Sequence, residues 1–115
     1  FLGVTFKPNT DDMREASSIP MIKYLNKKNS KIKYYDPSGE KDDFRGLKNV
    51  NFCSTISSAC HKADLLILHT EWNEFKLLDF KKLVKKNKFK IYDMRNLYSL
   101  SKMKKLNINY FSIGR

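Results

Sequence analysis

Short apolar runs of strand length alternate with segments of helical spacing along the whole sequence, and this alternation limits the fold more than any other feature. The strand-like runs cover residues 1–6, 31–36, 50–53, 65–69, 90–93 and 109–113. Helical spacing is found at about 18–29, 55–62, 79–86 and 101–106, with a short helix or loop at 40–47. Because right-handed crossovers place helices on both faces of a parallel sheet, the pattern predicts an α/β fold, a three-layer Rossmann-like sandwich with a mostly parallel sheet.

The first two helices carry start signals. Ser17 or Ser18 is the expected N-cap region of the first, which puts Pro20 in the first turn, where proline is tolerated; a start nearer Asp12 is the alternative. Ser54 is the expected N-cap of the second helix. The length of 115 residues suits one domain, residues 1–115. A buried strand that begins at residue 1 leads us to expect a native segment before it.

The cysteines and histidines form no catalytic or metal-binding pattern. Cys53 and Cys60 are not at a zinc or redox spacing, and we expect both in the core as free thiols of a reducing compartment. His61 is expected at a helix end and His69 at a strand end. The sequence contains no GxSxG or HExxH pattern. We therefore predict no catalytic residue and no metal site within this chain.

The formal net charge of +11 comes from an excess of lysine, clustered at 27–28, 81–82, 85–88 and 104–105. Three interpretations are open: a solvated lysine-rich surface, a nucleic-acid-binding patch, or a field that attracts an anionic ligand. Nucleic acid is not favoured as a partner, because we find neither a recognition helix nor a ladder of aromatic and basic residues. No apolar run approaches the roughly 20 residues that span a bilayer, and the first residues do not show the charged-then-apolar pattern of a signal peptide. We expect a cytoplasmic protein without a membrane partner.

Polar loops follow the predicted strands at the edge where open parallel sheets bind ligands, beyond the carboxyl ends of the strands. Lys7 follows the first strand and Arg95 follows the strand at 90–93. Both are placed to meet an anion, and an arginine can make two parallel hydrogen bonds to phosphate or carboxylate. The alternatives are a solvated Lys7 and an ion pair of Arg95 with Asp93. Trp72 is more simply explained by packing under its loop.

Two more polar residues have competing interpretations. Arg14 can serve a ligand or form an ion pair with Asp11, Asp12 or Glu15. Asp36, at the end of the second strand, occupies the place of the ribose-binding acid of dinucleotide-binding folds. The turn after the first strand has no GxGxxG pattern. We therefore favour a structural role for Asp36, as a turn cap.

Five segments then follow one another in a recognisable order. They are FKPNTDDMREA at 6–16, YDP at 35–37, AD at 63–64 leading to TEWNEF at 70–75, DMRNLY at 93–98, and YFSIGR at 110–115. Together they resemble the C-terminal domain of the UDP-glucose/GDP-mannose dehydrogenase family, in its UDP-glucose 6-dehydrogenase branch. The resemblance covers the chain from end to end, and the first and third segments are long enough to be specific.

The resemblance implies that residues 1–115 are the UDP-sugar-binding domain of an NAD-dependent enzyme that oxidises UDP-glucose to UDP-glucuronate. By resemblance, Phe6, Lys7 and Arg95 contact the UDP-sugar, and Arg14 reaches the cofactor NAD. The family's NAD-binding and central domains, the catalytic cysteine and the dimerising helix lie outside these residues. We therefore expect the rest of the dehydrogenase chain as a partner, a homo-oligomer in the full enzyme, and no turnover by this chain alone.

One position departs from the family pattern: Met94 stands where many members have glycine, which puts the presentation of Arg95 in doubt. Other functions stay open. The chain can belong to a dehydrogenase for GDP-mannose or UDP-N-acetylmannosamine. It can also be a stand-alone basic module for nucleotides or nucleic acid, or a non-functional remnant of a broken gene.

Overall fold

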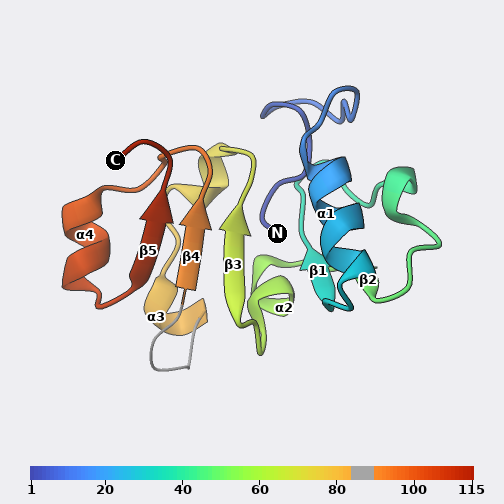
Figure 1. Cartoon of the computed structure of the whole chain (residues 1–115). Helices are drawn as coiled ribbons and strands as arrows, with labels where there is room; N and C mark the ends of the chain where they lie inside the picture. Colours follow the sequence, from blue (N-terminus) through green and yellow to red (C-terminus); the bar gives the residue numbers. More distant parts are fainter. Residues whose placement is uncertain (84–89) are drawn as a thin grey trace.

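The computed structural model describes residues 1–83 and 90–115, and helices and strands alternate along the chain as predicted (Figure 1). The strands are β1 Ile32–Tyr34, β2 Val50–Phe52, β3 Leu65–Leu68, β4 Lys90–Asp93 and β5 Asn109–Ser112. The helices are α1 Ser18–Lys27, α2 Ile56–Cys60, α3 Phe80–Leu83 and α4 Leu100–Lys105. Short 3₁₀ helices lie at Asp42–Phe44 and Asn73–Phe75. The predicted α/β class with parallel strands is confirmed.

The strands form two parallel sheets that a short segment joins. β1 pairs with β2, and β3, β4 and β5 pair in that order. Between them lies the N-terminal segment, residues 1–5, in which Leu2 bridges Tyr35 beyond β1 and Leu68 in β3. The order across the molecule is therefore β2, β1, N-terminal segment, β3, β4, β5. The carboxyl ends of all the strands consequently face the same edge.

The strand predicted at 1–6 is wrong in its extent. Only Leu2 is paired as in a strand, through a parallel bridge on each side. Its N–H donates to the Ile67 carbonyl at 2.9 Å, and its own carbonyl accepts from the His69 N–H at 3.0 Å. The cause is Gly3, whose φ of +77° takes the backbone out of the extended region immediately after the bridge.

Two apolar clusters lie on opposite faces of the sheets. One packs the strand residues Leu66, Leu68 and Ile91 against the helices α2, α3 and α4, through Ala59, Phe80 and Met103. The other packs Ile22 of α1 against Val4, Ile32, Tyr34 and Ile67. The predicted placement of helices on both faces is thus correct, because the strands present apolar side chains to both sides.

The two faces are covered unevenly. In Figure 1, α1 lies over β1 and β2, whereas β4 and β5 are open on that side. Tyr92 and Phe111, which are register partners, accordingly remain 39% and 50% exposed. Among the described residues, none of the helices combines the length and the apolarity that crossing a membrane would need.

The predicted N-cap is right for α1 and wrong by one residue for α2. Ser17 is the N-cap of α1 as expected, although its side chain does not cap the helix. The N-cap of α2 is Thr55 rather than Ser54, because the Thr55 hydroxyl accepts the Ser58 N–H at 3.1 Å. That helix ends at Cys60, with His61 as its C-cap. The helix predicted at 79–86 is seen as α3, and its last residues lie outside the described part.

Candidate functional site

Asp36 fixes the end of the N-terminal segment. The residue is 1% exposed, and its Oδ2 accepts the N–H groups of Val4 at 2.8 Å and Thr5 at 3.3 Å. Its Oδ1 accepts the Ser38 N–H at 2.9 Å and the Ser38 hydroxyl at 2.5 Å. The carboxylate is satisfied inside the chain, so the structural role predicted for Asp36 is confirmed and its oxygens do not face a ligand.

Thr5 connects the N-terminal segment to the loop that follows β3, residues 69–72. The Thr70 hydroxyl donates to the Thr5 carbonyl at 2.8 Å, and the Trp72 indole N–H donates to the Thr5 hydroxyl oxygen at 3.3 Å. The Thr5 hydroxyl donates in turn to the carbonyl oxygen of Lys7 at 3.0 Å. Trp72 also packs on the apolar cluster beneath, as the simpler interpretation of it predicted.

Gly3 makes this connection possible, and sequence reasoning missed it. A β-carbon built on Gly3 would lie 2.6 Å from the Thr70 β-carbon and 2.8 Å from the Thr70 carbonyl oxygen. Only a residue without a side chain allows the two backbones to approach so closely. A lone glycine inside an apolar strand pattern is the signal that could have indicated this contact.

Phe6 and Lys7 follow the anchored Thr5 directly. Both are exposed, Phe6 to 48%. The Phe6 N–H donates to the Asp12 carbonyl at 3.0 Å, which closes the loop at residues 6–12 back on itself. Both predicted site residues therefore stand on the surface at the carboxyl edge, within two residues of the contact with the loop at 69–72.

Arg95 reaches the same loop from the other side. Its Nε donates to the His69 carbonyl at 2.7 Å and lies 3.4 Å from Oε2 of Glu71. The ion pair with Asp93, which was the alternative interpretation, does not form, because the buried Asp93 carboxylate is bonded to backbone N–H groups and to the Tyr110 hydroxyl. No hydrogen bond within residues 1–83 and 90–115 uses the two terminal nitrogens of Arg95, so the guanidinium keeps donors for a ligand.

Asp93 builds the turn that presents Arg95. Its Oδ1 accepts the Arg95 N–H at 2.9 Å, and its Oδ2 accepts the N–H groups of Leu97 at 2.7 Å and Tyr98 at 3.1 Å. The Tyr110 hydroxyl donates to the same oxygen at 2.6 Å. Burial and this hydrogen bond raise the pKa of Tyr110 to about 12, so the phenol stays a donor at neutral pH.

Met94 lies between Asp93 and Arg95, and the turn accommodates its side chain. Its backbone angles lie outside the left-handed region that would call for glycine. Its N–H donates to the Leu68 carbonyl at 3.0 Å, and its side chain packs against the apolar cluster that contains Ile22 and Ile67. In this position methionine adds apolar contact and leaves the ladder between β3 and β4 continuous.

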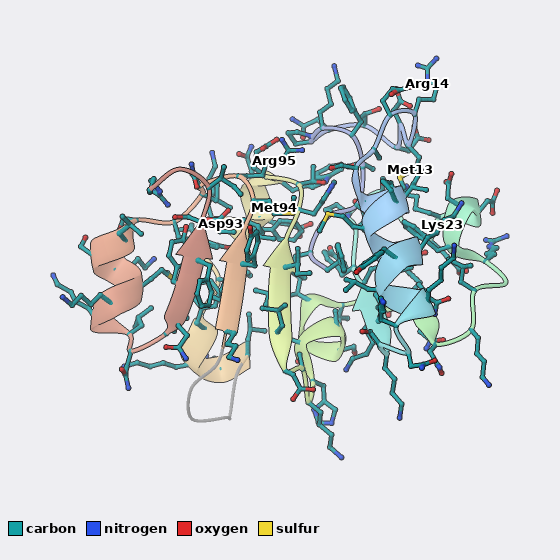
Figure 2. All side chains as sticks on the ribbon, in the orientation of Figure 1. Met13, Arg14, Lys23, Asp93, Met94 and Arg95 are labelled. Carbon is teal, nitrogen blue, oxygen red and sulfur yellow. The ribbon has the colours of Figure 1, made fainter. Side chains whose placement is uncertain are left out.

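Arg14 lies apart from the other predicted site residues. Figure 2 shows it at the outer tip of its loop, directed away from the sheets, whereas Arg95 lies above the end of β4. The Arg14 side chain is 89% exposed and pairs with Asp12 through Nε and Nη2, both at 3.1 Å. The Arg14 guanidinium lowers the pKa of Asp12. The ion pair weighed as an alternative therefore forms, with Asp12 as the partner.

His69 lies at the centre of the loop contacts and is completely buried. Its Nε2 is 2.8 Å from the Ser17 hydroxyl, and its Nδ1 is 3.0 Å from the Thr70 hydroxyl. Burial, and then the nearby Arg95 charge, lower the pKa of His69 to about 4. The strand-end position predicted for His69 is correct, but its neutral, bonded state could not be read from the sequence.

The remaining chemistry-bearing residues lie away from this edge or inside the core. Cys60 is buried, which raises the pKa of its thiol, and Cys53 packs partly buried on the same cluster. In the described part of the chain, no group of three histidine, cysteine or acidic side chains could hold a metal ion. A cavity of about 410 Å³ beside β2 is lined by residues such as Tyr34, Phe44 and Phe52, and contains none of the predicted site residues.

Comparison with known proteins shows which protein family the chain resembles. Residues 1–100 match the model of a family described as UDP-glucose/GDP-mannose dehydrogenase family, UDP binding domain. The UDP-glucose 6-dehydrogenase of Rhizobium meliloti is 37% identical over 115 residues, which is 99% of this chain and 26% of that protein. That of Rickettsia felis is 34% identical over 116 residues, which is 98% of this chain and 26% of that protein. The chain thus spans about a quarter of the length of these relatives.

Solved structures show the same fold. A UDP-D-ManNAc dehydrogenase from Pyrococcus horikoshii aligns with 99% of this chain and 24% of its own, at a TM-score of 0.76 and 22% identity. The UDP-N-acetyl-mannosamine dehydrogenase Cap5O from Staphylococcus aureus aligns with 99% of this chain and 25% of its own, at a TM-score of 0.70 and 26% identity.

Proposed function

This chain belongs to the UDP-glucose/GDP-mannose dehydrogenase family as its UDP-binding domain, and we propose that it forms the nucleotide-sugar wall of an NAD-dependent UDP-glucose 6-dehydrogenase. The observation that carries the proposal is the attachment of two predicted ligand-binding segments to one loop. Thr5, two residues before Lys7, is bonded to Thr70, and Arg95 is bonded to His69. A diphosphate between these cations would have its charge met from two sides.

Phe6, Lys7 and Arg95 are the residues we assign to the UDP-sugar. Lys7 offers a mobile ammonium, and Arg95 offers the planar fork that suits phosphate oxygens. Phe6 supplies an exposed apolar face beside them. We prefer UDP-glucose as the sugar nucleotide, because relatives named UDP-glucose 6-dehydrogenase match 98–99% of the chain at 34–37% identity. GDP-mannose or UDP-N-acetylmannosamine is the alternative.

NAD would be held mainly by the rest of the dehydrogenase chain, which is the partner we propose. Within this domain Asp36 is unsuited to a ribose, because both of its oxygens are already bonded to the chain. Arg14 is the residue that would reach the cofactor, since it is exposed at a loop tip and Asp12 holds its guanidinium. We also propose the cytoplasm as the compartment and a homo-oligomer as the full enzyme.

Calorimetric titration of the chain tests the proposal. UDP and UDP-glucose should bind to one site, and GDP more weakly. A random oligonucleotide, titrated at low and at high salt, should bind weakly at both. Tight oligonucleotide binding that collapses with salt, without any response to UDP, would instead identify a basic nucleic-acid-binding module.

Turnover is a separate question with a separate assay. Neither Cys53 nor Cys60 has the exposed, electropositive setting of a reactive thiolate. We therefore expect the chain, mixed with UDP-glucose and NAD, to produce no NADH. Measurable NADH from the chain alone would contradict the assignment of the chemistry to the rest of the enzyme.

A further inference from the structure

The proposed ligand contacts leave one polar side chain of the site unexplained, the imidazole of His69. It is completely buried between the start of α1 and the loop at 69–72. Its two ring nitrogens lie within hydrogen-bonding distance of the hydroxyls of Ser17 and Thr70. Its backbone carbonyl accepts the Arg95 Nε–H at 2.7 Å. One residue therefore touches α1, its own loop and the turn that carries Arg95.

Counting the available protons shows which group donates and which accepts in each of these hydrogen bonds. The single hydroxyl proton of Thr70 is directed at the Thr5 carbonyl, 2.8 Å away. Thr70 Oγ1 must then accept from His69, so the imidazole carries its proton on Nδ1. A neutral imidazole has one N–H, so Nε2 is the acceptor of the Ser17 hydroxyl. The proton donors run in one direction, from Ser17 through His69 and Thr70 to Thr5.

The Ser17 hydroxyl bonds to His69 instead of capping its own helix. Ser17 is the N-cap of α1, yet its side chain makes no capping bond, although serine is among the best capping residues. The neighbouring Ser18 hydroxyl donates to the Val4 carbonyl at 2.6 Å. The first turn of α1 is thus tied to the N-terminal segment by one serine and to His69 by the other.

We propose that His69 is a positioning residue for nucleotide binding, which holds Lys7 and Arg95 in register through the Nδ1–H tautomer of its ring and through its carbonyl oxygen. The inference rests on the proposed function, since it concerns the same ligand. The ring acts on the Lys7 side through Thr70 and Thr5, and the carbonyl acts on Arg95 directly. Loss of the ring would keep the bond of Arg95 to the backbone carbonyl but would loosen the link through Thr70 and Thr5, so Lys7 would no longer be held in place relative to Arg95.

Two substitutions separate the ring's bonds from its volume. His69→Phe keeps a buried ring and removes both nitrogens, so Thr70 loses its donor. His69→Asn can place an amide N–H near the position of Nδ1 and restore the bond to Thr70. We expect the UDP Kd to rise about tenfold in His69→Phe and at most about threefold in His69→Asn, since the lost bonds orient charged groups.

A double-mutant cycle provides a readout that a purely structural residue would not move. In the His69→Phe background, Lys7→Ala should weaken UDP binding by a smaller factor than it does in the unchanged chain, because Lys7 is no longer held in place. Equal factors in both backgrounds, or a ranking of UDP affinity that simply follows melting temperature, would overturn the inference.

Two further measurements keep the test decisive. If His69→Phe does not fold, Thr70→Val replaces it, because this change deletes the hydroxyl through which the ring acts on Thr5, and it should raise the UDP Kd in the same way. Nitrogen-15 NMR of the imidazole should show the Nδ1–H tautomer, and an Nε2–H tautomer would overturn the inference. If the unchanged chain binds no UDP, the proposed function fails. If it binds UDP and the His69 variants bind equally well, only the positioning role fails.

Discussion

Gly3 and Thr70 are in backbone contact so close that a β-carbon on Gly3 would lie 2.6 Å from the Thr70 β-carbon. Gly3→Ala should therefore destabilise the chain by at least about 2 kcal/mol, through overlap with Thr70 and through the strain of a positive φ. UDP affinity should fall as well, because the Thr5–Thr70 contact is displaced. Urea denaturation and calorimetry measure the two effects.

Gly46→Ala is the matched control for that change. Gly46 also has a positive φ, of +81°, but a β-carbon there would meet no atom within 4 Å. Only the strain remains, so we expect a loss of about 1 kcal/mol and unchanged UDP binding. Equal destabilisation by the two substitutions would show that steric overlap at Thr70 contributes nothing.

Replacement of the proposed ligand contacts gives the most direct test of the site. Lys7→Ala and Arg95→Ala should each weaken UDP binding by about 1 to 3 kcal/mol, the range for loss of a hydrogen bond to a charged group. Lys23→Ala is the control, because this exposed lysine lies on α1 away from the proposed site (Figure 2). Calorimetric Kd values that are unchanged in both variants would remove Lys7 and Arg95 from the site.

Asp93→Ala should damage stability and binding together. The change leaves the N–H groups of Arg95, Leu97 and Tyr98 without their acceptor, which we expect to cost about 3 kcal/mol of unfolding free energy. Tyr110→Phe is the milder comparison, with an expected loss of about 1 kcal/mol. It removes the hydroxyl that bonds the carboxylate and also contacts the Tyr98 carbonyl and Arg115, but the three backbone N–H groups keep their acceptor. Undiminished UDP affinity in a folded Asp93→Ala chain would show that this turn does not orient Arg95.

Met94→Gly introduces the residue that the family resemblance leads us to expect at this position. Because the methionine side chain packs in the apolar cluster of α1 and its backbone needs no glycine, we expect a loss of about 1 to 2 kcal/mol in stability. The UDP Kd should stay within about twofold. Clearly tighter UDP binding by the glycine variant would show that Met94 impairs the presentation of Arg95.

Acid should destabilise the chain through His69. Its pKa is about 4 when folded, below the ordinary value near 6.5, so the unfolded chain binds the proton first and stability falls as the pH drops through this window. The contribution between about pH 7 and about pH 4.5 is on the order of 2 kcal/mol. The change in unfolding free energy over that range should be smaller in His69→Phe, since buried carboxylates affect both chains alike. Identical pH dependence in the two chains would exclude a neutral, buried His69.

Hydrophobic periodicity was sufficient to predict the class of fold and the order of its elements. β4 was predicted with its observed bounds, Lys90–Asp93, because polar residues flank its apolar centre, although Asp93 is buried and Tyr92 is exposed in the fold. The first strand was predicted too long, since its pairing depends on a backbone angle at Gly3 that apolar composition does not encode. By residue type Ser54 is the better cap of the two, and only the geometry of the helix start selects Thr55.

The sequence was enough to predict the edge of the sheet at which the candidate site lies, but not the hydrogen bonds that join its residues. The rule that ligands bind beyond the carboxyl ends of parallel strands was enough to select Lys7 and Arg95. The ion-pair alternative for Arg95 named Asp93, its neighbour in sequence, whereas the fold buries that carboxylate and brings Glu71 within 3.4 Å of the guanidinium. The bonds of His69 join residues 17, 69 and 70, and such long-range contacts leave no local signal.

The carboxylate of Asp36 has one more consequence for the ligand edge. In dinucleotide-binding folds, backbone N–H groups near the end of the first strand receive a pyrophosphate. Here the comparable N–H groups, of Val4 and Thr5, already receive the Asp36 oxygens. A carboxylate of the chain itself thus occupies the place that a pyrophosphate takes in those folds. A diphosphate bound at this edge would therefore depend on side chains such as those we assign to it, Lys7 and Arg95, rather than on these two N–H groups.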